Sequence, residues 1–390
     1  MMKRSGGPHT HTDHKSARSR DGLPANVNLY DGNFPLFRKP VEIGSFSHDS
    51  ERKFIHDRSQ LKYYAPPEDK HRVHFDLTKG FDTFQDKSTI LKGSPELLDD
   101  LLRWVLQNRH KFSCQPNTPQ QQHGQLSEEL VKNLATDFIC WRGLLTKLLC
   151  TPYENREGWQ IAVTRFNGTF YLCDFETDQK KEQQARRTQR EEEMTYWGHK
   201  FEQYVVKSSP EEVPNTDEPV NNIEDFASVV RSRLESHSLV YGGEVDCCFG
   251  KDRESEYVEL KTSREMSHPK QEQNFKRFKL IKWWAQSFLI GIELIVGGFR
   301  DDYGMVHSLK EFPTKDIHRY CRDIQNCWMP NVCFNFLNKF LEYVKNSVTD
   351  DNPRQVYLFT WEPRQTVTFK KLELNSEFCF LPSWYTDVLS

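Results

Sequence analysis

The chain has 390 residues, of which 36% are hydrophobic and 13% aromatic, so it is long enough to bury a sizeable core. A net charge of −3 does not indicate a general nucleic-acid-binding surface, although a recessed groove can be basic on an acidic protein. The absence of a long apolar run or signal core argues against a membrane or secreted protein. The ten cysteines have no zinc-binding spacing, which favours reduced thiols inside the cell.

The N-terminal residues differ in composition from the rest of the chain. Residues 1–25 are rich in His, Lys, Arg, Ser and Gly and contain almost nothing apolar, which predicts a flexible tail before a domain of residues 26–390. The basic cluster Lys15–Arg20 is typical of a short nuclear address. Residues 33–67 are rich in Pro and aromatics, which predicts extended segments on the outside of the domain.

Apolar spacing and turn residues predict the elements of the domain in chain order. Helices are expected over residues 95–108, 128–149, 180–206, 222–234, 271–291, 314–323 and 332–345. Strands are expected at 160–166 and 169–173, joined by an Asn167-Gly168 turn, and at 242–246, 257–261, 293–300, 355–361 and 366–372. Loops are expected at 115–125 and 208–220.

Two charged triplets lie on consecutive predicted strands. Glu244 and Asp246 flank a valine, and Glu259 and Lys261 flank a leucine. Because side chains two apart in a strand point to the same face, adjacent strands would bring three carboxylates and one ammonium onto one patch of sheet. Carboxylates so close repel one another, and hard divalent cations would remove that cost. Either triplet alone is more typical of the solvated face of a strand.

Other polar residues on predicted helices could complete a site. Glu202 lies among aromatics, where a half-buried carboxylate needs a cation or hydrogen bonds, although a surface glutamate can satisfy the same pattern. Arg142 precedes Gly143. A glycine at this point of a predicted helix indicates either a break in the helix or the close approach of another group. The guanidinium of Arg142 could bind a phosphate through two hydrogen bonds. An arginine at a helix end is the simpler interpretation. Gln286 could orient a water molecule or hold a phosphate oxygen.

These residue types suit hydrolysis of a phosphodiester. Two divalent cations can stabilise the attacking and the leaving oxygens, and they would neutralise the four carboxylates. Lys261 would then face the scissile phosphate. The order of the predicted elements indicates a mixed sheet flanked by helices.

The chain resembles a known family at six segments. The two triplets resemble the PD-(D/E)xK nuclease core, and the chain is more specifically similar to the vertebrate-type decapping and exoribonuclease family. The resembling segments, in the family's order, are Trp141-Arg142-Gly143, Gly198-His199-Lys200-Phe201-Glu202, Gly243-Glu244-Val245-Asp246, Glu259-Leu260-Lys261-Thr262-Ser263, Lys282-Trp283-Trp284-Ala285-Gln286-Ser287-Phe288 and Gly298-Phe299-Arg300. The similarity extends from about Leu29 to Tyr385.

The resemblance implies a fold and an activity. The fold would be α+β, a single large domain with a mixed sheet flanked by helices and a second, smaller sheet. The activity would be metal-dependent hydrolysis of RNA 5′ ends, which removes unmethylated, NAD and triphosphate ends and degrades 5′-monophosphate RNA from 5′ to 3′. The family also implies residence in the nucleus, and a monomer is expected.

The family's pattern also implies roles for individual residues. Metal ions, two Mg²⁺ or Mn²⁺, would be held by Glu202, Glu244, Asp246, Glu259 and the carbonyl of Leu260. The catalytic set would be Glu202, Glu244, Asp246, Glu259, Lys261 and Gln286. Substrate would contact Arg52, Glu96, Trp141, Arg142, Gly143, Glu244, Lys261 and Gln286. His199 stands where relatives often carry an aromatic residue, and Ala227 stands at a position that the family's pattern implies for a substrate contact. Neither change affects the metal ligands.

Two other functions remain open. Some members of the family stabilise a separate 5′→3′ exoribonuclease, so a non-catalytic binding subunit is one alternative. The presence of all four carboxylates and Lys261 favours an enzyme, because a scaffold would not need them. A DNA nuclease on the same core is the second alternative.

Overall fold

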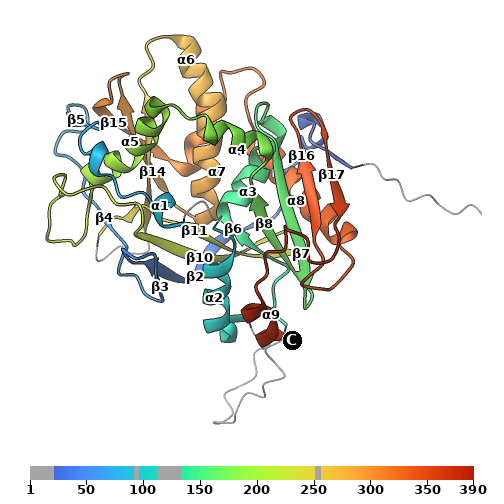
Figure 1. Ribbon diagram of the computed structural model, residues 1–390. Coiled ribbons are helices and arrows are strands. Elements are labelled where there is room, and N and C mark those ends of the chain that lie inside the picture. The colour runs from blue at the N-terminus through green and yellow to red at the C-terminus, as the bar shows by residue number, and fades with distance from the viewer. Residues whose placement is uncertain (1–21, 92–95, 113–132, 251–255) are drawn as a thin grey trace, which may run out of the picture.

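Two β-sheets with helices packed around and between them make up the architecture (Figure 1). The computed structural model describes residues 22–91, 96–112, 133–250 and 256–390. Residues 1–21 of the expected tail and the expected loop 115–125 lie outside the described residues.

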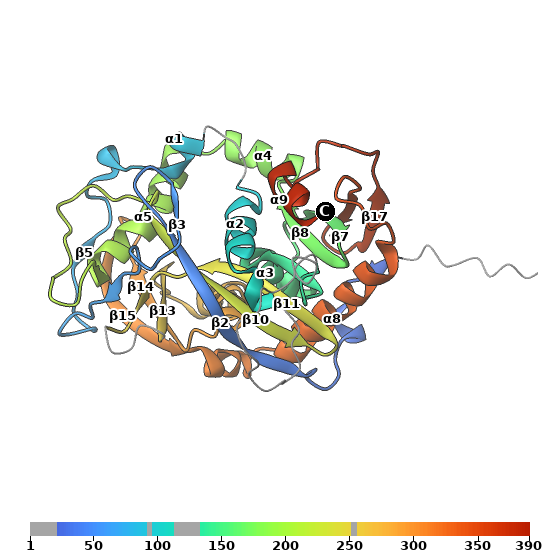
Figure 2. The same ribbon diagram turned by 90° about the horizontal axis from the view of Figure 1, so that it is seen from below.

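The larger sheet has ten strands, and most neighbours are antiparallel. Its order is β1 (Leu23–Pro24), β17 (Thr366–Lys371), β16 (Tyr357–Trp361), β7 (Trp159–Phe166), β8 (Thr169–Phe175), β6 (Phe138–Trp141), β11 (His237–Glu244), β10 (Asp225–Leu234), β2 (Phe37–His48) and β3 (Phe54–Ile55). Only β6 pairs in parallel within it, with β11 on one side and β8 on the other. Figure 2 shows β2 running beside β10 across this sheet.

The smaller sheet has seven strands. Its order is β5 (Phe75–Asp76), β15 (Met305–Pro313), β14 (Leu294–Arg300), β13 (Tyr257–Arg264), β12 (Cys247–Cys248), β4 (Tyr63–Tyr64) and β9 (Val206–Lys207). β13 and β14 are parallel over residues 258–264, whereas β12 pairs with β13 only at Tyr257 and Val258. The edge of β13 beyond Val258 is therefore open toward the larger sheet.

Helices cover both sheets and fill the space between them. They are α1 (Lys87–Leu91), α2 (Asp99–Gln107), α3 (Arg142–Cys150), α4 (Asp178–Ala185), α5 (Gln189–Val205), α6 (Pro269–Asn274), α7 (Leu280–Ile290), α8 (Pro330–Ser347) and α9 (Ser383–Leu389). Short 3₁₀ segments are η1 (Val27–Leu29), η2 (Phe81–Thr83), η3 (Arg109–Phe112), η5 (Thr151–Tyr153) and η8 (Thr314–Cys321), and η7 (Phe275–Lys279) is a π-helical turn that joins α6 to α7. In Figure 1, α3 and α7 lie between the β14–β15 side and the β16–β17 side.

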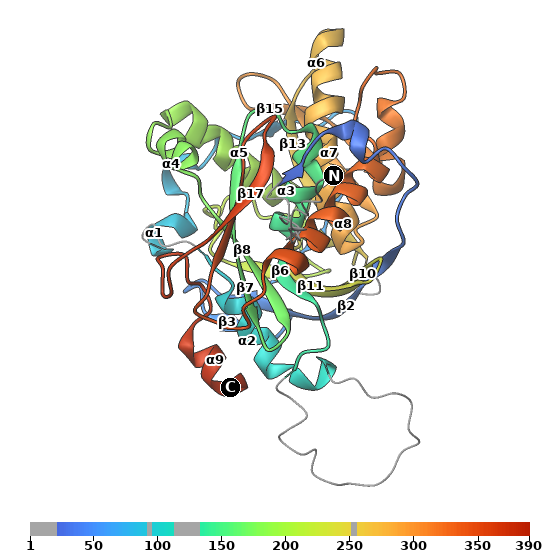
Figure 3. The ribbon, with the colours of Figure 1, turned by 90° about the vertical axis from the view of Figure 1, so that its right-hand side faces the viewer.

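The core consists of three apolar clusters that follow these layers. Leu145 and Trp284 belong to the largest, among α3, α7 and α8. Trp104 of α2 packs with Phe46 on one face of the larger sheet, close to α9 (Figure 3). Phe201 of α5 packs on the smaller sheet. The α+β fold with a mixed sheet, flanking helices and a second sheet is confirmed.

Two predicted helices are wrong. Residues 225–234 form β10, and the predicted helix over 128–149 is, in its described part, strand β6 followed by α3. β6 is apolar throughout, and most of β10 is buried on both faces, including Ser228 and Ser232, because neighbouring strands and helices cover both sides. Such strands lack the alternation of a half-buried strand, so periodicity alone cannot distinguish them from a buried helix.

Other local predictions are confirmed. β7 and β8 form the expected hairpin, and both Asn167 (φ 48°) and Gly168 (φ 78°) have the positive φ of a type I′ turn. Residues 180–206 are helical but divided, because Thr188 and Glu191 form a capping box that starts a new helix, α5. The flexible tail was expected to reach residue 25, but Leu23–Pro24 pair with β17 as β1.

The structure bears on the expectation of reduced thiols and on the expectation that the protein has no membrane span. Cys321 and Cys327 form a disulfide, which differs from the expectation of reduced thiols throughout. The other described cysteines are outside any disulfide within the described residues: Cys140, Cys150, Cys173, Cys247, Cys248, Cys333 and Cys379. Among the described residues, no helix combines the length and apolar character needed to span a membrane.

Candidate active site

Glu244 ends β11 at the border between the two sheets. The two glycines before it allow close packing, because a Cβ on Gly242 would lie 2.6 Å from the ring of Trp141 and a Cβ on Gly243 would lie 3.0 Å from the side chain of Arg142. The start of α3 therefore sits directly against β11. Ala227 lies opposite Glu244 in β10, and its side chain is buried.

Asp246 lies where the chain crosses from the larger sheet to the smaller one. Its Oδ2 accepts a hydrogen bond from the backbone N–H of Leu260 at 2.6 Å, at the open edge of β13. The expected adjacent pairing of strands 242–246 and 257–261 is thus wrong, because β11 and β13 belong to different sheets. The two triplets still meet, through Asp246 and Leu260, where the sheets approach each other.

Glu259 is almost completely buried and has two cationic partners. Its side chain is 1% exposed, its Oε2 lies 3.3 Å from Nη1 of Arg142, and its Oε1 accepts from Nζ of Lys261. Burial alone would raise the pKa of Glu259, but Lys261 and Arg142 outweigh it and lower the pKa. Burial would likewise lower the pKa of Lys261, and Glu259 and Asp246 raise it instead. Both groups are therefore charged at neutral pH.

Glu202, Glu244 and Asp246 line one recess with a volume of about 210 Å³, together with His199 of α5. Burial and repulsion from Glu259 and Glu202 raise the pKa of Asp246 well above its usual range. Burial and repulsion from Asp225 and Glu202 raise the pKa of Glu244. Glu244 is reached by solvent yet closely surrounded by protein, as expected on the floor of a recess. The recess therefore carries an excess of negative charge.

This donor set has the chemistry of a divalent-cation site. Carboxylate oxygens and a backbone carbonyl are hard ligands, and their repulsion is what a divalent ion relieves. In residues 22–91, 96–112, 133–250 and 256–390, however, no three His, Cys, Asp or Glu side chains are already close enough to hold one ion. The present partners explain this, because Glu259 faces Lys261 and Arg142 while Asp246 faces the Leu260 amide. The five-residue ligand set stays a prediction.

The excess charge predicts that divalent metal stabilises the protein. Millimolar Mn²⁺ or Mg²⁺ should raise the melting temperature, because an ion at about 100 times its Kd adds about 3 kcal/mol to the free energy of unfolding. Thermal denaturation with and without metal measures this. Asp246→Asn, which keeps an acceptor for the Leu260 amide, should reduce the rise. A wild-type melting temperature that does not respond to metal would contradict the site.

A second group of charged side chains lies on the α2 face of the larger sheet, beside Glu244. We call it the charged wall; its residues are His48, Arg52, Lys87, Glu96, Asp100 and Asp225. The carboxylate of Glu96 is held between two cations, with Oε2 at 3.1 Å from Nζ of Lys87 and Oε1 paired with Arg52. Arg52 and Glu96, expected separately as substrate contacts, thus form an ion pair.

The far end of the charged wall is buried. Nδ1 of His48 lies 2.6 Å from Asp225 and its Nε2 lies 3.0 Å from Asp100, and Nη1 of Arg52 also contacts Asp225 at 2.5 Å. Burial would lower the pKa of His48, but the hydrogen bonds to Asp100 and Asp225 outweigh it and raise the pKa to about 9. His48 is therefore a cation with two carboxylate partners.

The raised pKa makes stability depend on pH through His48. A folded-state pKa of about 9 against the usual 6.5 means that protonation favours the folded protein. The contribution is complete below pH 6.5 and is lost as the pH rises through about 9, a change on the order of 2 kcal/mol after solvent screening. Urea denaturation of wild type and His48→Gln at pH 6 and pH 9.5 measures it. The difference between the two proteins should shrink at the higher pH; an unchanged difference would contradict the charged histidine.

Comparison with known proteins identifies the family. The model of the RAI1 like PD-(D/E)XK nuclease family matches residues 38–386. The chain belongs to this family. It is 42% identical over 382 residues to the decapping and exoribonuclease protein of Homo sapiens, covering 96% of this chain and 92% of the human one.

Solved structures of the family have the same fold. The crystal structure of S. pombe Rai1 in complex with 3′-FADP matches with a TM-score of 0.69 and 26% identity, covering 89% of this chain and 98% of that chain. The structure of Candida albicans Rai1 in complex with pU5-Mn2+ matches with a TM-score of 0.74 and 22% identity, covering 94% of this chain and 98% of that chain. The resemblance based on six motifs is confirmed.

Trp141, Gly143 and Gln286 are the remaining residues expected from the family's pattern. Trp141 donates from its indole N–H to the carbonyl of Leu97 at 2.7 Å, which ties β6 to the segment before α2. Gly143 follows Arg142 in the first turn of α3, and a Cβ there would meet open space. Gln286 is half-buried on α7, which packs against α3. Their contacts with substrate stay predictions.

Sequence reasoning missed Lys87, His48, Asp100 and Asp225, which complete the charged wall. None of them belongs to a motif, because their pairing depends on strands and helices that are distant in the chain. The resemblance marks His199 only as a departure from the family's pattern, but in the structure its Nδ1 lies 3.7 Å from Oε2 of Glu202. Burial would lower the pKa of His199, and Glu202 and Glu244 outweigh it and raise the pKa.

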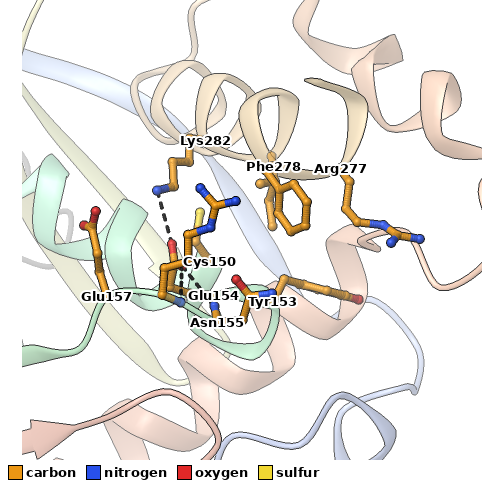
Figure 4. Close-up of a pocket in the computed structure, with 10 residues that line it drawn as sticks. Cys150, Tyr153, Glu154, Asn155, Glu157, Arg277, Phe278 and Lys282 are labelled. Atoms are coloured by element: carbon orange, nitrogen blue, oxygen red, sulfur yellow. Dashed lines mark hydrogen bonds and ion pairs between the residues drawn. The ribbon is translucent and has the colours of Figure 1, made fainter. Parts of the chain in front are cut away.

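A second, smaller pocket lies apart from the family's motif carboxylates. It has a volume of about 120 Å³ between the segment after α3 and the α7 side, and it is lined by Cys150, Tyr153, Glu154, Asn155, Arg156, Glu157, Arg277, Phe278, Ile281 and Lys282 (Figure 4). Nζ of Lys282 lies 3.2 Å from Oε2 of Glu154, so its charge is already neutralised. None of the expected site residues lines this pocket.

Proposed function

We propose that the protein is a divalent-metal-dependent hydrolase of RNA 5′ ends. It removes unmethylated, NAD and triphosphate ends and degrades 5′-monophosphate RNA from 5′ to 3′. One observation carries the proposal: Glu244 and Asp246 line one recess, and Asp246 accepts a hydrogen bond from the amide of Leu260 on β13. The neighbours of Leu260 in the chain are Glu259, which pairs with Arg142, and Lys261, which pairs with Glu259. Membership of the nuclease family and the names of the relatives, decapping and exoribonuclease protein and decapping nuclease, support it.

The residues of the chain have separable roles in this reaction. Glu202, Glu244, Asp246, Glu259 and the carbonyl of Leu260 would hold the metal. A bound divalent cation would supply a nucleophilic hydroxide and charge stabilisation at the phosphate. Lys261 and Arg142, which both pair with Glu259, would donate to phosphate oxygens of the substrate. Gln286 would orient the water or the phosphate.

The two alternatives are less well supported. A binding subunit would not need a cluster of carboxylates whose repulsion raises the pKa of Asp246 and Glu244, because such charges destabilise a scaffold. A DNA nuclease would have the same metal chemistry, so only the substrate can separate it from the proposed enzyme.

Purified protein should therefore be given RNAs that share one body and differ only at the 5′ end, with and without Mn²⁺. The ends are NAD, unmethylated cap, triphosphate, monophosphate and hydroxyl, and a 5′-phosphorylated DNA of the same sequence is included. Metal-dependent release of the 5′ group from RNA, followed by loss of the body, supports the proposal. Preference for DNA, or no hydrolysis of any RNA, contradicts it.

Two further properties belong to this proposal. We place the enzyme in the nucleus on the basis of its family and its basic N-terminal residues. We also propose that it acts as a monomer. Fluorescence microscopy of the tagged chain and sedimentation analysis of the purified chain test these two statements.

A further inference from the structure

Lys87 is a charged side chain at the site to which the family's motifs assign no role. It begins α1, where its backbone N–H donates to Oδ1 of Asn222 at 2.6 Å, and its Nζ lies 3.1 Å from Glu96. Its side chain is 32% exposed. Asn222, which accepts from the Lys87 amide, lines the same recess as Glu244, so Lys87 lies beside that recess. Burial would lower the pKa of Lys87, but the charges of Glu244 and Glu96 raise it. Lys87 thus lies between the charged wall and the active site.

The two cations that pair with Glu96, Arg52 and Lys87, differ in how many other groups hold them in place. Arg52 is 11% exposed, and its other nitrogen is fixed by Asp225 and by the carbonyl of Ile223 at 2.8 Å. Within the described residues, the side chain of Lys87 pairs with Glu96 alone. Because Arg52 alone can neutralise Glu96, Lys87 can turn away without leaving a buried charge unpaired. Lys87 is therefore the available cation of the charged wall.

We propose that Lys87 is a further substrate-binding residue, which contacts the pyrophosphate bridge of capped RNA 5′ ends. The inference rests on the proposed function, in which Arg142 and Lys261 hold the phosphate beside Glu259. Arg142 packs against Gly243 on one face of β11, and Glu244 points to the other face, the α2 face. Lys87 lies toward that second face, where it pairs with Glu96 just before α2. A 5′ end that reaches it must extend past the terminal phosphate, as an NAD or nucleotide cap does.

The charges of the site favour a change of partner by Lys87, from Glu96 to the pyrophosphate of the substrate. In the free protein the ammonium of Lys87 is attracted by both Glu96 and Glu244. Once metal neutralises Glu244, that attraction is weaker, and a pyrophosphate offers a stronger acceptor. A charge-assisted hydrogen bond of this kind changes binding by about tenfold or more. The contact would therefore distinguish capped ends from 5′-monophosphate ends.

The test compares two RNAs with the same body, one NAD-capped and one 5′-monophosphorylated, in the presence of Mn²⁺. Lys87→Met should lower kcat/KM on the capped RNA by about tenfold more than on the monophosphate RNA. Lys87→Arg should retain most of the preference. Lys39→Met, at an exposed ion pair with Glu293, is the matched control and should behave as wild type on both, because neither residue lines the recess.

Inhibition gives a second measurement that does not depend on turnover of the cap. NAD should inhibit degradation of monophosphate RNA more weakly in Lys87→Met than in wild type, whereas AMP, which lacks the pyrophosphate bridge, should inhibit both alike. Lys87→Gln serves as the neutral variant if melting shows that Lys87→Met does not fold.

The outcomes separate the inference from the proposed function. Equal losses on both RNAs, or no loss on the capped RNA, overturn the role of Lys87 while leaving the enzyme intact. Wild-type protein that hydrolyses neither RNA overturns the proposed function itself.

Discussion

Glu244→Gln combined with Asp246→Asn should abolish hydrolysis of every RNA 5′ end, with a loss of about a thousandfold or more, or about 4 kcal/mol in the barrier. The reason is that both carboxylates line the recess and each is an expected ligand of the metal that stabilises the transition state. Asp246→Asn keeps an acceptor for the Leu260 amide, so the local backbone should not change. Release of the 5′ group from NAD-capped RNA measures the effect.

The same double variant should be more stable than wild type without metal. A raised carboxyl pKa means that the protonated form is favoured on folding, so wild type loses stability as the pH rises from the usual carboxyl range through the raised pKa values of Asp246 and Glu244. The amides remove that cost, and the advantage should disappear in acid. Turnover at the wild-type rate by a folded double variant would eliminate the metal assignment.

Lys261→Met should lower activity by about a hundredfold and also destabilise the fold. The activity falls because a donor to the phosphate is lost. The stability falls because Glu259, which is 1% exposed, keeps only Arg142 as a cationic partner. The loss should be about 2 kcal/mol, less than the roughly 3–5 kcal/mol seen when a buried ion pair is broken completely. Single-turnover kinetics and urea denaturation measure the two effects.

Lys261→Arg is the control, because it retains the charge next to Glu259. Its stability should stay close to that of wild type, while its activity should fall partially, since a guanidinium places its donors differently from an ammonium. If Lys261→Met were as active as wild type, Lys261 would not contact the reacting phosphate. If it were equally stable, the ion pair with Glu259 would contribute little.

Local chemistry explains which elements could be predicted. The Asn167-Gly168 hairpin, the strand at 294–300 and helix α8 depend on turn residues and apolar spacing within a few positions of one another. β6 and β10 were missed because burial on both faces removes the alternation that marks a strand. The six family motifs located the site because each is a short run of residues and they follow one another in the family's order, whatever elements carry them.

The sequence by itself determined the family, the α+β class and the acidic and basic residues that make up the motifs. Only the tertiary structure decided that Glu244 and Asp246 end up at the border of two sheets, and that Lys87, Arg52 and Glu96 lie together beside them. The physical reason is that ion pairs between segments far apart in the chain depend on how sheets and helices pack, and they leave no periodic pattern in the order of the residues.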